Sequence, residues 1–321
     1  MKHFLSLSIV MLTLLLPGIA AADGSVSAEI DGVEYIIWYT GYRESAVGEH
    51  AIVGCSQKSL SGSVSIQSTV TGTLYWYEND VLCSQSVTAP VRIINYNAFS
   101  YNNNITDIYI PESIVSIYWN AFEECTGLTH VTIPASVGTI GTQAFLNCTN
   151  LTTITWNAKN CSEPYQSKHL YDPWRDGFWG GCPIKLIIIG EEVESIGNYV
   201  FDSGSWLDPD YNGVERVISK AIIPPRIEEY TVPFYYGNCS LSVPIQSLQA
   251  YKNAPYWNLF FIRAIGDAND DGNVNIDDAT ELIDMMLSMN TPENNNADVD
   301  GDGRVSIDDV TELIDMMLKG N

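Results

Sequence analysis

Hydrophobic positions recur at a fixed interval in the middle of the chain. Ile94, Ile117 and Ile140 lie 23 residues apart, and an Ala-Phe pair follows each of them four residues later. The unit reads I-x-x-x-A-F-x-x-C-x-x-L-x-x-V-x-I-P-x-S-V. Self-similarity at a period of this size is the signature of a solenoid, in which each repeat forms one coil.

Each repeat contains one segment that predicts a short strand. The V-x-I stretch alternates apolar and polar positions, which favours a half-buried strand. The following Pro cannot donate a hydrogen bond to a neighbouring rung, so we expect the strand to end there. No single coil can hide its Ile, Phe and Leu side chains, and several coils must stack to bury them. The sequence therefore predicts a mainly β solenoid.

Degenerate copies extend this array in both directions. A fourth copy follows an insertion, where Ile196 begins a match to the unit and Trp179 and Cys182 stand at the Phe and Cys positions. Further apolar segments resemble the V-x-I-P part of the unit, namely residues 64–70, 187–193, 222–224 and 241–244.

The repeats and their flanks resemble the BspA-type leucine-rich repeats of bacterial surface proteins. The resemblance is strongest over residues 91–157 and extends over residues 30–265, including the closing Tyr251 and Trp257. Members of that family are adhesins and host-protein binders, which implies a binding role. We expect an N-terminal β cap with degenerate repeats at 23–90, and a solenoid with a C-terminal cap at 91–265.

An insertion at 157–182 interrupts the regular spacing and is rich in aromatic residues. Insertions in solenoids emerge as loops on one face, so we expect Tyr165, Tyr171 and Trp174 to contact the ligand. Phe178 lies in the same insertion. The alternative is that these side chains fold back to cover the edge of the solenoid.

The chain has seven cysteines, and an odd number leaves at least one outside any intramolecular disulfide. Cys125 and Cys148 hold the same place in successive coils, where we expect buried thiols. If an intramolecular disulfide forms, Cys161 and Cys182 are the candidates, because they bracket the insertion.

The C-terminal segment carries a duplicated acidic motif. Residues 267–278 and 298–309 form two twelve-residue loops of EF-hand type, with Gly272 and Gly303 at position 6, where the chain must turn sharply. Two such loops in phase predict two Ca²⁺ ions, and the alternative is an acidic disordered tail. The expected oxygen ligands are Asp267, Asn269, Asp271, Asn273 (carbonyl), Asn275 and Asp278 in the first loop, and Asp298, Asp300, Asp302, Arg304 (carbonyl), Ser306 and Asp309 in the second.

A helical pattern follows each loop, but the residues before Asp267 do not predict a helix. We expect Leu282, Ile283, Met286 and Leu287 to form the apolar stripe of the first helix.

A loop followed by a helix, given twice, resembles a type I dockerin over residues 266–321. The resemblance implies a cohesin domain as partner, recognised through Ile276, Asp277, Ile307 and Asp308 at loop positions 10 and 11. The alternative for these four residues is ordinary helix-start chemistry, with Asp near the positive end of the helix dipole.

The first 22 residues have the pattern of a secretory signal. A basic start at Lys2 is followed by an apolar stretch at 4–16, which is too short to span a bilayer, and by small residues at 20–22. We expect cleavage after Ala22, and no later segment is apolar enough to cross a membrane. The mature protein is therefore expected to be extracellular or attached to a cell surface.

Charge and motifs narrow the function further. The net charge of −24 disfavours nucleic acid and anionic membranes as partners. The chain contains no GxSxG, HExxH, GxGxxG or P-loop motif, so we expect no enzyme. The sequence predicts a secreted, non-catalytic protein whose solenoid binds a protein or glycan ligand. The alternative is a cellulosome accessory subunit in polysaccharide degradation, binding carbohydrate or carrying weak hydrolase activity.

Overall fold

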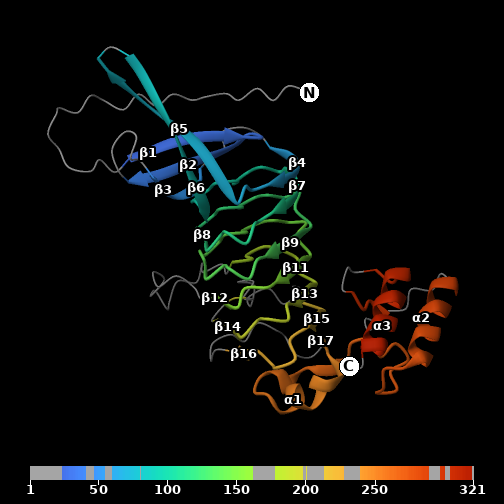
Figure 1. Ribbon diagram of the computed structural model, residues 1–321. Helices are drawn as coiled ribbons and strands as arrows, with labels where there is room; N and C mark the ends of the chain where they lie inside the picture. Colours follow the sequence, from blue (N-terminus) through green and yellow to red (C-terminus); the bar gives the residue numbers. More distant parts are fainter. Residues whose placement is uncertain are drawn as a thin grey trace.

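The protein is a β solenoid with an antiparallel cap at its N-terminal end and a pair of helices beside its C-terminal end (Figure 1). The structure, a computed structural model, describes residues 24–40, 47–54, 60–79, 81–161, 178–197, 200, 213–227, 239–288, 297–300 and 304–319. The predicted signal segment lies outside the described residues. The predicted fold class, a β solenoid followed by a small helical module, is confirmed.

The V-x-I stretches form the rungs of one parallel sheet, which runs in the order β18-β17-β15-β13-β11-β9. Pairing stays in phase from coil to coil, with Val131 opposite Ile154 and Ile154 opposite Ile187. These side chains point into the core and are buried. The rungs are β9 (His130–Ile133), β11 (Thr153–Trp156), β13 (Leu186–Ile189), β15 (Arg216–Ser219), β17 (Ser240–Val243) and β18 (Phe261–Ala264).

The Ile that opens each unit lies in a second set of short parallel strands. Ile94 pairs with Ile117, and Ile117 with Ile140, while Cys161 takes the Ile position and pairs with Ile196. These strands are β8 (Ser116–Ile117), β10 (Thr139–Ile140), β12 (Asn160–Cys161), β14 (Ser195–Ile196) and β16 (Arg226–Ile227).

The Phe positions stack into an aromatic column through the core. The ring centroids of Phe99 and Phe122 lie 5.1 Å apart, and those of Phe122 and Phe145 lie 4.8 Å apart, with nearly parallel planes. Trp179 continues the column at 4.7 Å from Phe145, which confirms that it fills the Phe position after the insertion. Phe178 is also buried and takes the Ala position, so its side chain belongs to the core.

The cysteines form a parallel column of thiols. The thiols of Cys125, Cys148 and Cys182 each donate a hydrogen bond to the Phe carbonyl of the preceding coil, with Sγ–O distances of 3.0, 3.2 and 3.0 Å. Cys161 and Cys182 are thiols and are not joined, so the Cys161–Cys182 disulfide is wrong. Each of the two occupies a core position of the repeat, and burial raises the pKa of the Cys161 thiol to about 12.

The N-terminal cap is antiparallel, which the repeat pattern does not predict. Strands β1 to β3 form a meander that joins the solenoid where β3 pairs with β6. The long hairpin of β5 and β6 projects away from the coils (Figure 1). The predicted degenerate copy at Val64 is a true rung, because β4 pairs in parallel with β7. The strands are β1 (Gly24–Ile30), β2 (Val33–Thr40), β3 (Val47–Val53), β4 (Ser61–Ser65), β5 (Thr69–Glu78), β6 (Val81–Ile94) and β7 (Asn104–Tyr109).

Three short helices close the C-terminal end of the solenoid: η2 (Ile245–Ser247), α1 (Leu248–Asn253) and η3 (Trp257–Leu259). Tyr251 of α1 and Trp257 of η3 are buried there. The Tyr251 hydroxyl lies 2.6 Å from the Ser219 hydroxyl and donates a hydrogen bond to the carbonyl of Ala221, and Trp257 donates one to the carbonyl of Pro225. These bonds satisfy polar groups that the cap buries.

One predicted rung is misplaced. Ile222 and Ile223 were expected in the V-x-I-P position, but both are exposed, and the rung of that coil is β15. Pairing decides this register, because Val217 lies opposite both Ile187 and Leu241.

The C-terminal module contains helices α2 (Ile276–Ser288) and α3 (Ile307–Lys319), which pack against each other. The segment before the first loop is strand β18, which confirms that no helix precedes the loop. The predicted stripe of α2 is only partly correct: Leu282 is buried and Met286 partly so, but Ile283 and Leu287 are exposed. Ala279 and Met285 complete the buried face instead. Within the described residues, no helix has both the length and the apolar character needed to cross a bilayer.

Candidate calcium and recognition sites

The first acidic loop, residues 267–278, is folded around its own carboxylates. Asp278 lies at the start of α2, is fully buried, and accepts hydrogen bonds from the backbone N–H groups of Ala268, Asn269 and Asn275 at 2.8, 3.2 and 2.8 Å. It therefore ties the start of the loop to its end.

At the other end of the loop, Asp267 accepts bonds from the N–H groups of Asp271 and Gly272. Gly272 has a φ of +85°, a conformation that L side chains rarely adopt, as position 6 of such a loop requires.

Local electrostatics distinguish the first loop's carboxylates. Burial is the main reason that the pKa of Asp267 lies above its usual value. Hydrogen bonds from the backbone and side chain of Asn273 lower the pKa of Asp271, which lies on the exposed side of the loop.

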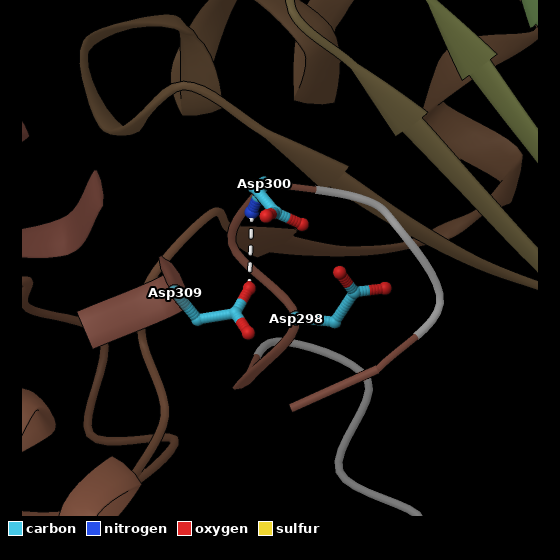
Figure 2. A group of neighbouring side chains, drawn as sticks. All are labelled: Asp298, Asp300 and Asp309. Atoms are coloured by element: carbon cyan, nitrogen blue, oxygen red, sulfur yellow. Dashed lines mark hydrogen bonds between the residues drawn. The ribbon is translucent and has the colours of Figure 1, made fainter. Parts of the chain in front are cut away.

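The second loop repeats this arrangement. Asp309 accepts bonds from the N–H groups of Val299, Asp300 and Ser306 at 2.6, 3.1 and 2.7 Å. One oxygen from each of Asp298, Asp300 and Asp309 lies within 4.8 Å of the others. Figure 2 shows these side chains coming from the loop and from the start of α3, with the bond from the N–H of Asp300 drawn to Asp309.

The described ligand residues of both loops fit Ca²⁺. Each offers an oxygen to the ion, and two carboxylates of each loop are buried: Asp267 and Asp278 in the first, Asp298 and Asp309 in the second. Buried carboxylates are costly unless they are paired or bind a metal, and Ca²⁺ takes six to eight oxygen ligands. Of the twelve predicted ligand residues, Asp302 lies outside the described residues.

The four residues predicted to bind cohesin are all exposed. Ile276 and Asp277 begin α2, and Ile307 and Asp308 begin α3 at the equivalent places. Further exposed apolar residues extend each pair along the same helix face, seven and eleven residues after the isoleucine. They are Ile283 and Leu287 on α2, and Ile314 and Leu318 on α3.

A cluster of partly exposed aromatic residues lies on one corner of the solenoid. The ring centroid of Tyr96 lies 4.7 Å from that of Tyr118 and 5.9 Å from that of Trp119. Gly141 of the next coil leaves room for the Trp119 ring, because a Cβ on residue 141 would lie 2.2 Å from Cδ1 of Trp119. Alignment of the repeats could have revealed that these aromatic residues share one turn. In two successive coils they fall between the repeating Ile and the repeating Ala-Phe pair.

The predicted ligand residues Tyr165, Tyr171 and Trp174 lie outside the described residues, but the ends of their segment are fixed. Cys161 occupies the Ile position and Phe178 the Ala position of their coil. The segment that links these two positions contains Tyr96 in one coil and Trp119 in the next. The insertion therefore replaces the same turn of the repeat.

The structure also reveals a functional candidate without any sequence signal. The guanidinium of Arg216, on rung β15, pairs with the carboxylate of Asp298, the first residue of the second loop. Nothing in the spacing of the chain links these residues, which are 82 positions apart.

Comparison with known proteins agrees with this division of the chain. The sequence pattern of the BspA type leucine rich repeat region matches residues 73–207 in six copies, and that of the dockerin type I domain matches residues 265–318. None of the curated proteins compared with the chain matches it.

Solved structures of bacterial leucine-rich-repeat proteins are similar over parts of the chain. A leucine-rich repeat protein from Bacteroides capillosus is 24% identical, with 44% of this chain and 88% of that chain covered and a TM-score of 0.33. A leucine rich cell surface protein from Faecalibacterium prausnitzii is 18% identical, with 69% and 55% covered and a TM-score of 0.37. The chain thus joins a BspA-type leucine-rich repeat region to a C-terminal type I dockerin domain.

Proposed function

We propose that the protein is a secreted, non-catalytic binding protein, whose dockerin attaches it to a cohesin domain and whose solenoid binds a protein or glycan ligand. Both recognised domains are of non-catalytic types, and type I dockerin domains bind calcium. The observation that carries the proposal is the pair of matched acidic loops, each leading into a helix with an exposed apolar face.

Each loop is proposed to bind one Ca²⁺ ion through its oxygen ligands, giving two ions in all. The ligand residues are those at loop positions 1, 3, 5, 7, 9 and 12, with the backbone carbonyl serving at position 7. When bound, the ion neutralises the carboxylates that come together in the folded loop, and the loop orients the following helix. Asn275 and Ser306 also begin these helices, because their side chains accept bonds from the N–H groups of Asp277 and Asp308.

Cohesin recognition is proposed to use either helix face. Alignment of residues 267–287 with 298–318 gives 15 identities in 21 positions, and the run from Thr to Leu in each helix is identical. The exposed apolar residues of α2 recur at the same places in α3. Each half therefore offers nearly the same surface to a partner.

Substitutions in one half at a time test this proposal. Against a panel of recombinant cohesins, we expect Ile276→Ala/Asp277→Ala to weaken binding only a few-fold, because the second half still engages. Its matched control, Ile307→Ala/Asp308→Ala, should behave alike. Changing all four residues should cost about 100-fold or more, as for loss of a central contact cluster. Loss of all binding in one half-variant would contradict two-sided recognition.

The solenoid ligand is proposed to bind the corner that carries Tyr96, Tyr118 and Trp119, together with Tyr165, Tyr171 and Trp174 of the insertion, which interrupts the equivalent turn of a later coil. Exposed aromatic rings stack on sugar rings or anchor a protein partner. Two observations support this corner: the rings gather there from two coils, and the insertion enters the chain at the equivalent turn.

Screening the full chain against polysaccharides and extracellular-matrix proteins tests this corner. Trp119→Ala should reduce binding of any hit by about tenfold, as for an aromatic anchor residue. Tyr77→Ala, which removes a more exposed aromatic ring from the distant β5–β6 hairpin, is the control and should have no effect. Equal binding by both variants would exclude the corner as the ligand site.

A further inference from the structure

The outward face of the parallel sheet changes character along the solenoid. On β9 and β11 the outward positions hold His130 and Thr residues, which are partly exposed. On β13 and β15 they hold Leu186, Ile188 and Ile218, all buried. These side chains belong to one buried cluster with residues of the dockerin, among them Ala297 just before the second loop and Val299 within it.

Charged groups from the sheet hold the start of the second loop. The Arg216 guanidinium donates one hydrogen bond to the Asp298 carboxylate at 2.7 Å and another to the Asp298 carbonyl at 2.9 Å. Both side chains are almost fully buried, with 9% and 5% of their surface exposed. Lys220 donates to the carbonyl of Asp300 at 3.1 Å.

The first loop is held differently. The carboxylate of Asp267, the counterpart of Asp298, accepts bonds from its own loop. An arginine also reaches this loop, but Arg263 pairs with Asp270 at position 4, which is not a ligand position, and the pair is partly exposed.

The dockerin follows the solenoid without a spacer. Only Ile265 and Gly266 separate the last rung β18 from the first loop, and the N–H of Ile265 still donates to the carbonyl of Val243 in the sheet. Gly266 lies against the dockerin core, since a Cβ there would be 2.7 Å from Cδ1 of Leu313. The short covalent link and the packing contact therefore both fix the dockerin against the solenoid.

We propose that the solenoid is a structural part of the second calcium site. Arg216 and Lys220 hold ligand positions 1 and 3 of that loop in place, so calcium binding there and docking of the dockerin on the sheet form one coupled equilibrium. The two calcium sites of the chain are consequently unequal, although their sequences are nearly alike. This inference rests on the calcium binding proposed above.

Linkage makes the coupling measurable from both sides, because calcium must stabilise the solenoid by as much as docking strengthens calcium binding. All tryptophans lie outside residues 266–321, so tryptophan fluorescence follows the solenoid alone. In the full chain, calcium should raise the melting temperature of the tryptophan transition by several degrees.

Arg216→Ala tests the coupling, with Arg263→Ala as the matched control. Arg216→Ala should abolish the calcium-induced rise and weaken one of the two sites about tenfold or more in calorimetry, because the loop loses the contact that holds ligand position 1 in place and couples it to docking. Arg263→Ala should keep both properties. Arg216→Met, which retains an apolar stem, repeats the test if the Ala variant does not fold.

The outcomes separate the two proposals. If calorimetry detects no calcium binding to the unaltered chain, the proposed function fails. If calcium binds at two sites but Arg216→Ala and Arg216→Met keep the full rise in melting temperature, the coupling is wrong and the loops alone make the sites.

Discussion

Removal of calcium with a chelator is expected to abolish most of the helical circular-dichroism signal of the full-length protein. Among the described residues, helices α2 and α3 hold 13 residues each, against 6 in α1, so their helical signal reports mainly on the dockerin. Without the ion, buried carboxylates of each loop repel one another at close range, and the free energy of calcium binding is then also free energy of folding. Adding calcium back should restore the signal.

Two matched variants locate the effect. Asp278→Ala and Asp309→Ala remove the carboxylate that links the ends of each loop, and each should remove one calcium ion from the calorimetric stoichiometry. Mg²⁺ should substitute poorly, because it demands a smaller octahedral site. A helical signal that is indifferent to chelation would refute calcium-dependent folding.

Phe122→Ala is expected to destabilise the solenoid by about 3–5 kcal/mol, the usual cost of removing a buried aromatic ring. Phe122 stacks between Phe99 and Phe145, so its loss breaks the aromatic column on both sides. Urea denaturation followed by tryptophan fluorescence measures the change, since the buried Trp156 and Trp179 belong to the solenoid.

Tyr109→Ala is the control for this experiment. Its ring lies on β7 of the same solenoid but is 59% exposed, so its loss should change the free energy of unfolding by about 0.5 kcal/mol or less. If the two substitutions cost the same, the column does not stabilise the fold in the way its geometry indicates.

The features that recur along this chain are predictable from sequence, because every copy of the repeat or loop shows the same residue pattern. The rung at Ile154, the place of Trp179 and the twelve-residue loops all follow from spacing alone. The prediction of strand register fails where two apolar pairs could each form the rung of one coil. Val217-Ile218 and Ile222-Ile223 both fit a strand, and only pairing with the neighbouring coils selects the first.

Contacts between the two domains could not be predicted from the repeat pattern, because the residues that make them do not recur in each copy. Leu186 and Ile188 fall in an apolar run, and their side chains point away from the solenoid core. They are buried because the dockerin covers them. Arg216 resembles any surface residue, because its partner Asp298 is distant in sequence. The aromatic corner at Trp119 is a different case, because alignment of the repeats places its residues at one turn of two coils but does not show that their rings meet.

Because the coils are regularly spaced, the number of coils sets the length of the solenoid. Ser116–Ile117 pairs with Thr139–Ile140 without any shift, so loss or gain of one 23-residue copy leaves every remaining rung in register. Each such step changes the distance between the β5–β6 hairpin and the dockerin by about 4.8 Å, the spacing of neighbouring strands. Duplication of a coil would thus move the aromatic corner at Trp119 away from the dockerin in fixed increments.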